Sequence, residues 1–124
     1  MGEMFRGAGA FNGDISKWDV CSAMDMQAMF YRTSSFDRDL SEWKVSHVTN
    51  MKEMFAFAES FNQDLSKWNV ARVVDMNKMF YDAKKFNQEL CGKEWVDSDA
   101  TRFDMFAKSS GKLSKKICGA LGPW

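Results

Sequence analysis

The sequence predicts an α/β solenoid in which each coil of about 25 residues contains a short helix and a short parallel strand. Apolar residues recur at a fixed step of 25 positions, a period typical of chains whose successive repeats stack. Each repeat also joins a segment with helical apolar spacing to a segment with alternating spacing. A hydrophobic content of 45% supplies a core for one domain. The recurring columns are Met4, Met29, Met54 and Met79; Phe5, Phe30, Phe55 and Phe80; Phe11, Phe36, Phe61 and Phe86; Ile15, Leu40, Leu65 and Leu90; and Trp18, Trp43 and Trp68.

Helices are expected at equivalent places of three repeats, near residues 26–33, 51–58 and 76–83. In the middle repeat Met51, Met54 and Phe55 have the i, i+3, i+4 spacing of one helical face. Asn50 followed by Glu53 fits a capping box. Helices of about two turns do not persist alone, so packing between coils must stabilise them.

Strands are expected where the pattern DLSxWxV places a tryptophan and a valine two residues apart, as in Trp68 and Val70. These segments would pair in parallel through neighbouring coils. They span residues 15–20, 40–45, 65–70 and 90–96.

Two columns of Asx or Glu residues lie between the expected helix and strand of each repeat. We expect their side chains to accept hydrogen bonds from backbone amides in consecutive turns. The alternative is a calcium site, because stacked carboxylate and amide oxygens are the ligands that this hard cation prefers. The columns are Asn12, Asp37, Asn62 and Asn87, and Asp14, Asp39, Asp64 and Glu89.

Charge divides the chain into two parts. Residues 1–106 are expected to form the repeat solenoid, with four full repeats and the start of a fifth. Residues 107–124 contain four lysines and no acidic residue, whereas all 17 acidic residues lie earlier, so this part is expected to be a basic C-terminal cap or tail. The alternative for the tail is contact with an anionic surface such as a membrane.

Several classes of function find no support in the sequence. The formal net charge is zero, so no nucleic-acid partner is expected. Neither a signal peptide nor a transmembrane segment is visible, and the compartment is left open. Cys21, Cys91 and Cys118 replace small residues of other repeats and are interpreted as small buried residues without a closed disulfide framework. No catalytic pairing or cofactor motif appears around the single histidine, His47, so we expect neither an enzyme nor a cofactor.

The start of the sequence bears on its partners. Met1 falls in the column of Met26, Met51 and Met76, so the sequence begins within a repeat. Repeat arrays need polar end coils for solubility. An uncapped N-terminal end therefore indicates a fragment, a trimmed protein or an end covered by a protein partner.

The string FNQDLSKWNV followed by VVDMNKMF closely resembles the repeat of a mycoplasma surface-protein family of unknown function. That family is related to BspA-like leucine-rich repeats and is sometimes described as PARCEL repeats. The resemblance covers residues 1–90, whereas residues 91–124 depart from it. It implies leucine-rich-repeat-like coils in a protein of the cell surface or of an organelle-associated assembly, and it brings no catalytic residues.

We therefore expect a non-enzymatic protein–protein interaction or adhesion module, used alone or as a small subunit of a larger assembly. Positions that vary while the scaffold residues stay fixed mark the candidate partner-binding surface. A calcium-stabilised structural repeat is the alternative function. The candidate residues are Tyr31, Arg32, Phe57 and Tyr81 on the helix side, and Lys17, Glu42, Lys44 and Lys67 on the strand side.

Overall fold

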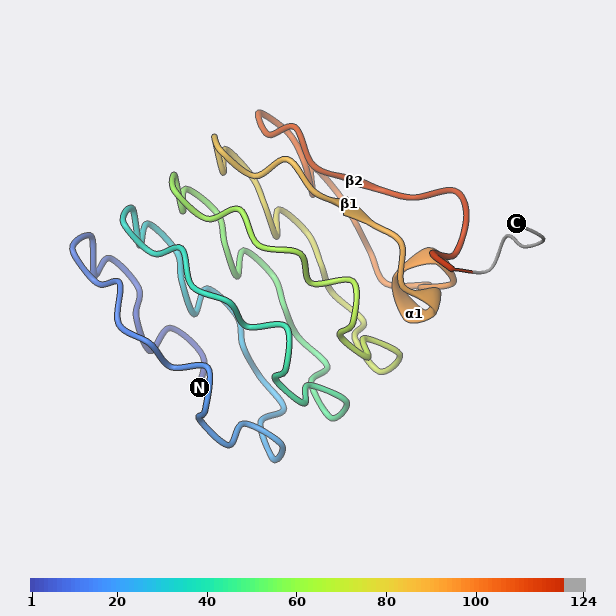
Figure 1. The fold of residues 1–124 in the computed structure, drawn as a ribbon, viewed down its shortest axis with the longest axis horizontal. Coiled ribbons are helices and arrows are strands. Elements are labelled where there is room, and N and C mark those ends of the chain that lie inside the picture. Colours follow the sequence, from blue (N-terminus) through green and yellow to red (C-terminus); the bar gives the residue numbers. More distant parts are fainter. Residues whose placement is uncertain (120–124) are drawn as a thin grey trace.

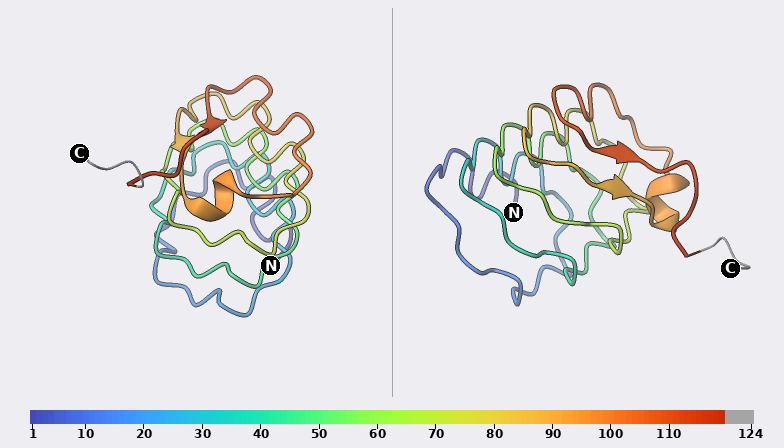
Figure 2. Two further views of the ribbon diagram at one scale, coloured as in Figure 1. Left: turned by 90° about the vertical axis from the view of Figure 1, so that its right-hand side faces the viewer. Right: turned by 45° about the horizontal axis from the view of Figure 1, so that its top comes forward.

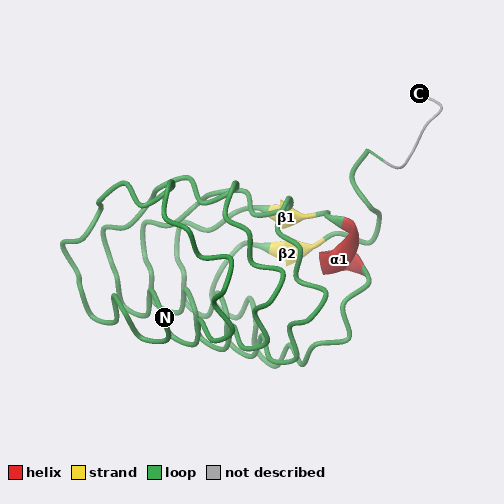
Figure 3. Ribbon diagram, turned by 90° about the horizontal axis from the view of Figure 1, so that it is seen from below, coloured by secondary structure: helices red, strands yellow, loops and turns green. Residues whose placement is uncertain are grey.

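The computed structural model describes residues 1–119, in which successive repeats form loops of the chain that lie side by side (Figure 1). Viewed along the array, the loops overlie one another around a common interior (Figure 2). Regular structure is short and lies late in the described chain, whose remainder consists of turns and irregular segments (Figure 3). Its elements are β1 (Glu89–Leu90), α1 (Lys93–Val96) and β2 (Lys112–Leu113), and β1 pairs with β2 in parallel.

The predicted α/β solenoid of leucine-rich-repeat-like coils is therefore wrong, because the repeats do not consist of a helix and a strand. Where helices were expected, near residues 26–33, 51–58 and 76–83, the chain forms runs of turns. The segments 15–20, 40–45 and 65–70 contain no strand. In the segment 90–96, expected to be a strand, only Leu90 belongs to one, and α1 follows it.

An alternating pattern of backbone hydrogen bonds explains why the turn segments are not helices. The amides of Met29 and Tyr31 donate to carbonyls three residues earlier, at 3.2 and 3.1 Å, which closes turns. The amide of Phe30, between them, instead donates to the carbonyl of Met54 in the next repeat at 2.9 Å. An α-helix needs every amide to bond four residues back. Every second amide here bonds a neighbouring repeat, so the helix cannot form.

Left-handed backbone conformations mark the same turns. Each turn segment has two such residues four positions apart, and the third residue of a turn is where a type II geometry requires a positive φ. The capping box expected from Asn50 and Glu53 is also absent, because Glu53 has φ +57° and Asn50 Oδ1 accepts the amide of Lys52 at 3.0 Å. The residues with positive φ are Glu3, Ala28, Arg32, Glu53, Phe57, Lys78, Asp82, Asp104 and Lys108, together with Gly7 and Gly119.

Glu53 offers a test of this geometry. A β-branched side chain disfavours left-handed backbone, so Glu53→Val is expected to lower the free energy of unfolding by about 1–2 kcal/mol. Glu53→Gly is expected to be neutral or to stabilise by up to about 1 kcal/mol, because glycine adopts a positive φ without strain. Urea unfolding measures both. Lys52→Gly, one position earlier in the turn, is the control and should destabilise; equal effects of glycine at both positions would contradict the assignment.

Just before the expected strands, side-chain oxygens rather than backbone carbonyls accept the amides of the neighbouring repeat. The amide of Asn62 donates to Asp37 Oδ1 at 3.0 Å, and the amide of Asn87 donates to Asn62 Oδ1 at 2.9 Å. These bonds satisfy the amides, but the acceptor is a side chain and not a backbone carbonyl, so no strand pairing forms. On this side of the described repeats, backbone carbonyls accept such bonds only at the last repeat, where the amide of Lys112 donates to the Gln88 carbonyl at 3.0 Å and β1 pairs with β2.

The core consists of apolar columns in the predicted 25-residue register. Phe55 stacks on Phe80 of the next repeat with ring centroids 5.4 Å apart, and on Phe61 of its own repeat at 4.1 Å. The Trp43 and Trp68 rings lie nearly parallel at 6.4 Å. Trp18 tilts against Phe5 as Trp43 does against Phe30, but it is 43% exposed. Successive repeats therefore bury one another's aromatic faces.

The C-terminal part of the described chain corrects the interpretation of the cysteines. Cys91 and Cys118 form a disulfide, and the amide of Cys118 also donates to the Cys91 carbonyl at 2.8 Å. Cys21 is a free thiol and is exposed rather than buried. Leu113 lies opposite Leu90 in the β1–β2 pair, so it continues the leucine column after a shortened step that hid it from the sequence pattern. The part of the predicted tail beyond residue 119 lies outside the described residues.

Candidate interaction surfaces

Three half-buried aromatic side chains form what we call the aromatic edge: Tyr31, Phe57 and Tyr81. They come from the turn segments of consecutive repeats. The Tyr31 and Phe57 rings meet edge to face with centroids 5.4 Å apart, and Phe57 and Tyr81 do the same at 5.5 Å. The structure therefore joins three predicted partner-binding residues into one continuous row.

Basic side chains lie over the faces of these rings. The Arg32 guanidinium is 4.5 Å from the Phe57 centroid and 5.4 Å from that of Tyr31, and the Arg6 guanidinium is 4.7 Å from the Tyr31 centroid. Cations over ring faces gain energy from the ring quadrupole, and each contact fixes a long side chain. The aromatic edge is therefore a surface of aromatic rings with cations over their faces.

Two lysines at this edge were missed by sequence reasoning. Lys78 Nζ and Lys108 Nζ lie 5.5 and 5.7 Å from the Tyr81 centroid. Lys78 could have been found, because it precedes Tyr81 by the three residues that bring side chains together across a turn. Lys108 lies after the break in the 25-residue register, so no signal in the sequence points to it.

The remaining predicted residues form a separate charged row of Lys17, Glu42 and Lys67, with Lys44 beside it. Lys67 Nζ lies 3.4 Å from Glu42 Oε2, and both side chains are more than two-thirds exposed. An exposed pair of this kind contributes little to stability. Glu42, Lys44 and Lys67 line a shallow hollow of about 300 Å³. These residues come from the segment that follows the leucine column, not from the turns of the aromatic edge.

Six of the eight residues proposed as calcium ligands accept hydrogen bonds from backbone amides through a side-chain oxygen, and Glu89 instead pairs with Lys112. Asp14 Oδ1 accepts the amide of Ser16 at 3.0 Å, and Asp39 Oδ1 accepts that of Ser41 at 2.8 Å. Hydrogen bonds from Ser16 and Ser41 lower the pKa of the two carboxyl groups below its usual value. Within residues 1–119, no group of three or more His, Cys, Asp or Glu side chains is arranged to hold a metal ion.

These turns predict a response to acid. Because the pKa of Asp39 is lower in the folded state, its bond to Ser41 contributes stability above the unfolded pKa, and that contribution is lost as pH falls through the folded pKa. Asp39→Asn keeps an acceptor oxygen, as Asn69 does for the amide of Ala71. We expect the variant to match the parent near neutral pH and to lose less stability between about pH 5 and pH 2. Thermal unfolding at several pH values measures this; identical pH profiles would contradict it.

His47 and Cys21 show no catalytic arrangement. His47 Nδ1 lies 3.0 Å from the Cys21 carbonyl oxygen, so the ring contacts the backbone rather than the thiol. The hydrogen bond with Asp19 raises the pKa of the Cys21 thiol, which disfavours the nucleophilic thiolate. Among the described residues, no helix has the length and apolar character needed to cross a bilayer.

Comparison with known proteins identifies a family. A family model described as a mycoplasma protein of unknown function, DUF285, matches residues 1–118. Neither the curated proteins nor the solved structures contain a significant match to this sequence.

Proposed function

The chain belongs to the DUF285 family of repeat proteins, and we propose that it is a non-enzymatic protein-binding module that contacts its partner through the aromatic edge. The single observation that carries the proposal is the continuous row of Tyr31, Phe57 and Tyr81 with guanidinium groups over its rings. Tyrosine and arginine dominate the binding energy of protein interfaces, which makes this row the strongest candidate contact on the molecule.

The rigidity of the edge supports the proposal. The amides of Arg32 and Phe57 donate to carbonyls of the next repeat, at 2.9 Å to Ala56 and 2.8 Å to Tyr81. The backbone that carries each aromatic residue is thereby fixed relative to its neighbours. A pre-ordered surface loses less conformational entropy on binding than a mobile one. Because less entropy is lost, a few residues of the aromatic edge could bind a partner without a large interface.

The disulfide favours an extracellular setting. Bonds such as Cys91–Cys118 persist in oxidising environments, and are rare where thiols are kept reduced. The resemblance of the repeat motif to BspA-like surface proteins favours the same setting. Adhesion at a cell surface, or membership of a surface assembly, is the form of binding that we propose.

A capture experiment with matched variants tests the aromatic edge. The purified full chain is immobilised and exposed to surface-protein extracts, and each captured protein is then titrated against the parent and two variants. Tyr31→Ser/Phe57→Ser/Tyr81→Ser removes the aromatic edge, and Lys17→Ser/Glu42→Ser/Lys67→Ser removes the charged row. We expect the first variant to weaken binding at least about 30-fold, equivalent to about 2 kcal/mol, and the second to change it less than about threefold.

The opposite ranking would contradict the proposal and move the contact to the charged row. Circular dichroism and unfolding midpoints establish that each variant is folded before binding is compared. Ser is used rather than a charged residue, so that loss of binding reports lost contact area and not new repulsion.

The calcium-stabilised repeat stays an alternative prediction. Its candidate ligands would have to give up or share amide bonds such as Asp39 Oδ1 to Ser41. Calcium ions favour six to eight oxygen ligands, so binding should order or stabilise several repeats at once. A rise in unfolding temperature on adding calcium, reversed by a chelator, would support this alternative; an unchanged midpoint would reject it.

A further inference from the structure

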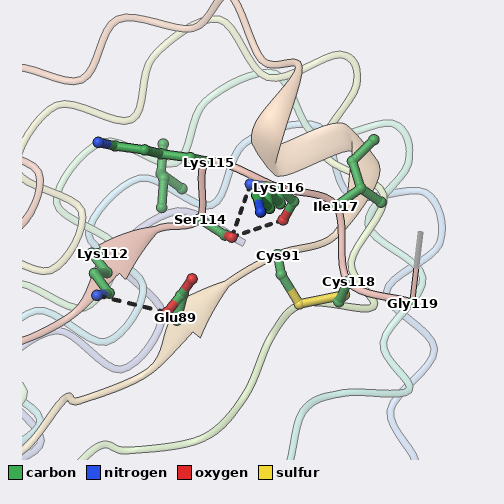
Figure 4. A pocket seen from close by; sticks show the side chains of 10 residues that line it. Glu89, Cys91, Lys112, Ser114, Lys115, Lys116, Ile117, Cys118 and Gly119 are labelled. Atoms are coloured by element: carbon green, nitrogen blue, oxygen red, sulfur yellow. Dashed lines mark hydrogen bonds and ion pairs between the residues drawn. A yellow bond between two sulfur atoms is a disulfide. The ribbon is translucent and has the colours of Figure 1, made fainter. Parts of the chain in front are cut away.

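A hollow of about 650 Å³ lies beside the disulfide, where the segment after β2 crosses the end of β1 (Figure 4). A volume of this size is within the range of small-molecule sites. The residues that line it include Lys112, Lys115 and Lys116 together with the Cys91–Cys118 disulfide. The hollow is distinct from both the aromatic edge and the charged row.

The charge around the hollow is strongly positive. No acidic residue occurs between residue 105 and the end of the sequence. Among the described residues that line the hollow, Glu89 is the one acidic residue, and its Oε1 lies 3.7 Å from Lys112 Nζ. That pair is more than half exposed, so it is weak and exchanges readily with other ions. Three ammonium groups against one carboxylate leave a net charge of +2 at the site.

Local bonds hold the lysine-bearing segment in place. The Ser114 hydroxyl accepts the amide of Lys116 at 3.1 Å and donates to the Lys116 carbonyl at 2.7 Å, which forms a tight turn with Lys115 at its centre. Ser114 is itself bonded to β1, because its amide donates to the Leu90 carbonyl at 2.9 Å. Four residues after Ser114, the disulfide fixes Cys118 to Cys91. The backbone of the segment is therefore anchored at both ends, which keeps the Cα atoms of Lys115 and Lys116 at the hollow.

We propose that this hollow binds a phosphate-bearing ligand, with Lys115 and Lys116 as the principal contacts and Lys112 released from Glu89 to join them. Lysine binds phosphate as a point charge that does not require the fixed geometry of a guanidinium fork. The shared chemistry is a phosphate group with two or more negative oxygens. It can come from a soluble phosphate compound or from the headgroup of an anionic lipid.

Titration with inorganic pyrophosphate at low salt tests the site in the full chain. We expect binding by the parent, and binding about 10- to 30-fold weaker in Lys115→Gln/Lys116→Gln, because each lost charge pair in water is worth about a fivefold change. Lys17→Gln/Lys44→Gln removes the same charge elsewhere and should bind like the parent. Raising the salt concentration should weaken the parent more than the double variant.

A second arm separates the two sources of phosphate. Vesicles of phosphatidylcholine with and without phosphatidylglycerol are sedimented with the parent protein. Retention on the anionic vesicles that is lost in Lys115→Gln/Lys116→Gln identifies a lipid headgroup as the ligand. Binding of pyrophosphate with no vesicle retention identifies a soluble ligand.

A third arm removes the disulfide and measures pyrophosphate affinity. Cys91→Ser/Cys118→Ser releases one anchor of the lysine segment, so pyrophosphate affinity should fall although no charge is removed. The proposal is overturned if the parent does not bind pyrophosphate at low salt, or if the two lysine double variants lose affinity equally. Equal loss would mean attraction by net charge and not by a site.

Discussion

Trp68→Ala is expected to lower the free energy of unfolding by about 3–5 kcal/mol. The Trp68 side chain is 1% exposed, its ring stacks on Trp43, and its indole nitrogen donates to the Leu40 carbonyl at 2.8 Å. Removing it opens a cavity between two repeats and takes one of two hydrogen bonds from the Leu40 carbonyl, which keeps the amide of Trp43 at 3.0 Å. Both costs fall on the interface between repeats, on which stability depends. Denaturant unfolding followed by circular dichroism measures the change.

The same column of the sequence supplies the control. Trp18 occupies the equivalent position in the first repeat but is 43% exposed, so Trp18→Ala should cost about 1–2 kcal/mol, clearly less than Trp68→Ala. Trp68→Phe keeps most of the ring and loses the indole donor, and should cost about 1–3 kcal/mol. Similar losses at Trp18 and Trp68 would contradict the view that burial between repeats determines the contribution of this column.

The register of the repeats was predictable from the sequence because aromatic columns can stack only if equivalent residues meet. Phe30, Phe55 and Phe80 are 25 residues apart and lie face to face as that step requires. The local conformation was not predictable from the same spacing. Apolar residues at i, i+3 and i+4 fit a helix, but they also fit consecutive turns whose intervening amides bond to the next repeat.

The sequence signal that would have distinguished consecutive turns from a helix is weak in this chain. Left-handed turn positions are usually marked by glycine or asparagine. Here they are filled by ordinary residues such as Glu53, Lys78 and Phe57, and among the equivalent positions only Gly7 carries the expected mark. Bonds to neighbouring repeats hold these residues at positive φ, and such tertiary bonds cannot be seen in one repeat alone.

The candidate surfaces were also predictable from the sequence only in part. Tyr31, Phe57 and Tyr81 could be placed on one side because they lie one repeat apart, within a residue. The contact of Lys108 with Tyr81 could not be predicted, because the 25-residue register is broken before residue 108. The pairing of Cys91 with Cys118 was hidden for a related reason: an odd number of cysteines with no fixed spacing gives no connectivity, and only the shortened path after residue 108 brings the two together.

Gly92→Ala is expected to lower the free energy of unfolding by about 3 kcal/mol, the upper end of the cost of overfilling a packed site. A Cβ atom on Gly92 would overlap the Ser66 carbonyl oxygen and lie 3.2 Å from Trp95 Cδ1. Neither neighbour can yield, since the oxygen belongs to the backbone and Trp95 is fully buried. The backbone at residue 92 cannot shift away from Ser66 either. The adjacent Cys91 amide donates to Ser66 Oγ, and Cys91 is bonded to Cys118 by the disulfide.

Gly9→Ala is the matched control. A Cβ atom there meets nothing within 4 Å, and the backbone does not have a positive φ, so the change should be neutral or slightly stabilising. Thermal unfolding of the two variants, with the disulfide intact in both, gives the comparison. Because Gly92 opens α1 and follows Cys91, its replacement should also loosen the disulfide end of the array and weaken pyrophosphate binding, whereas Gly9→Ala should leave that binding unchanged. Unchanged stability in Gly92→Ala would show that the last described repeats are not held together by close backbone contact at this point.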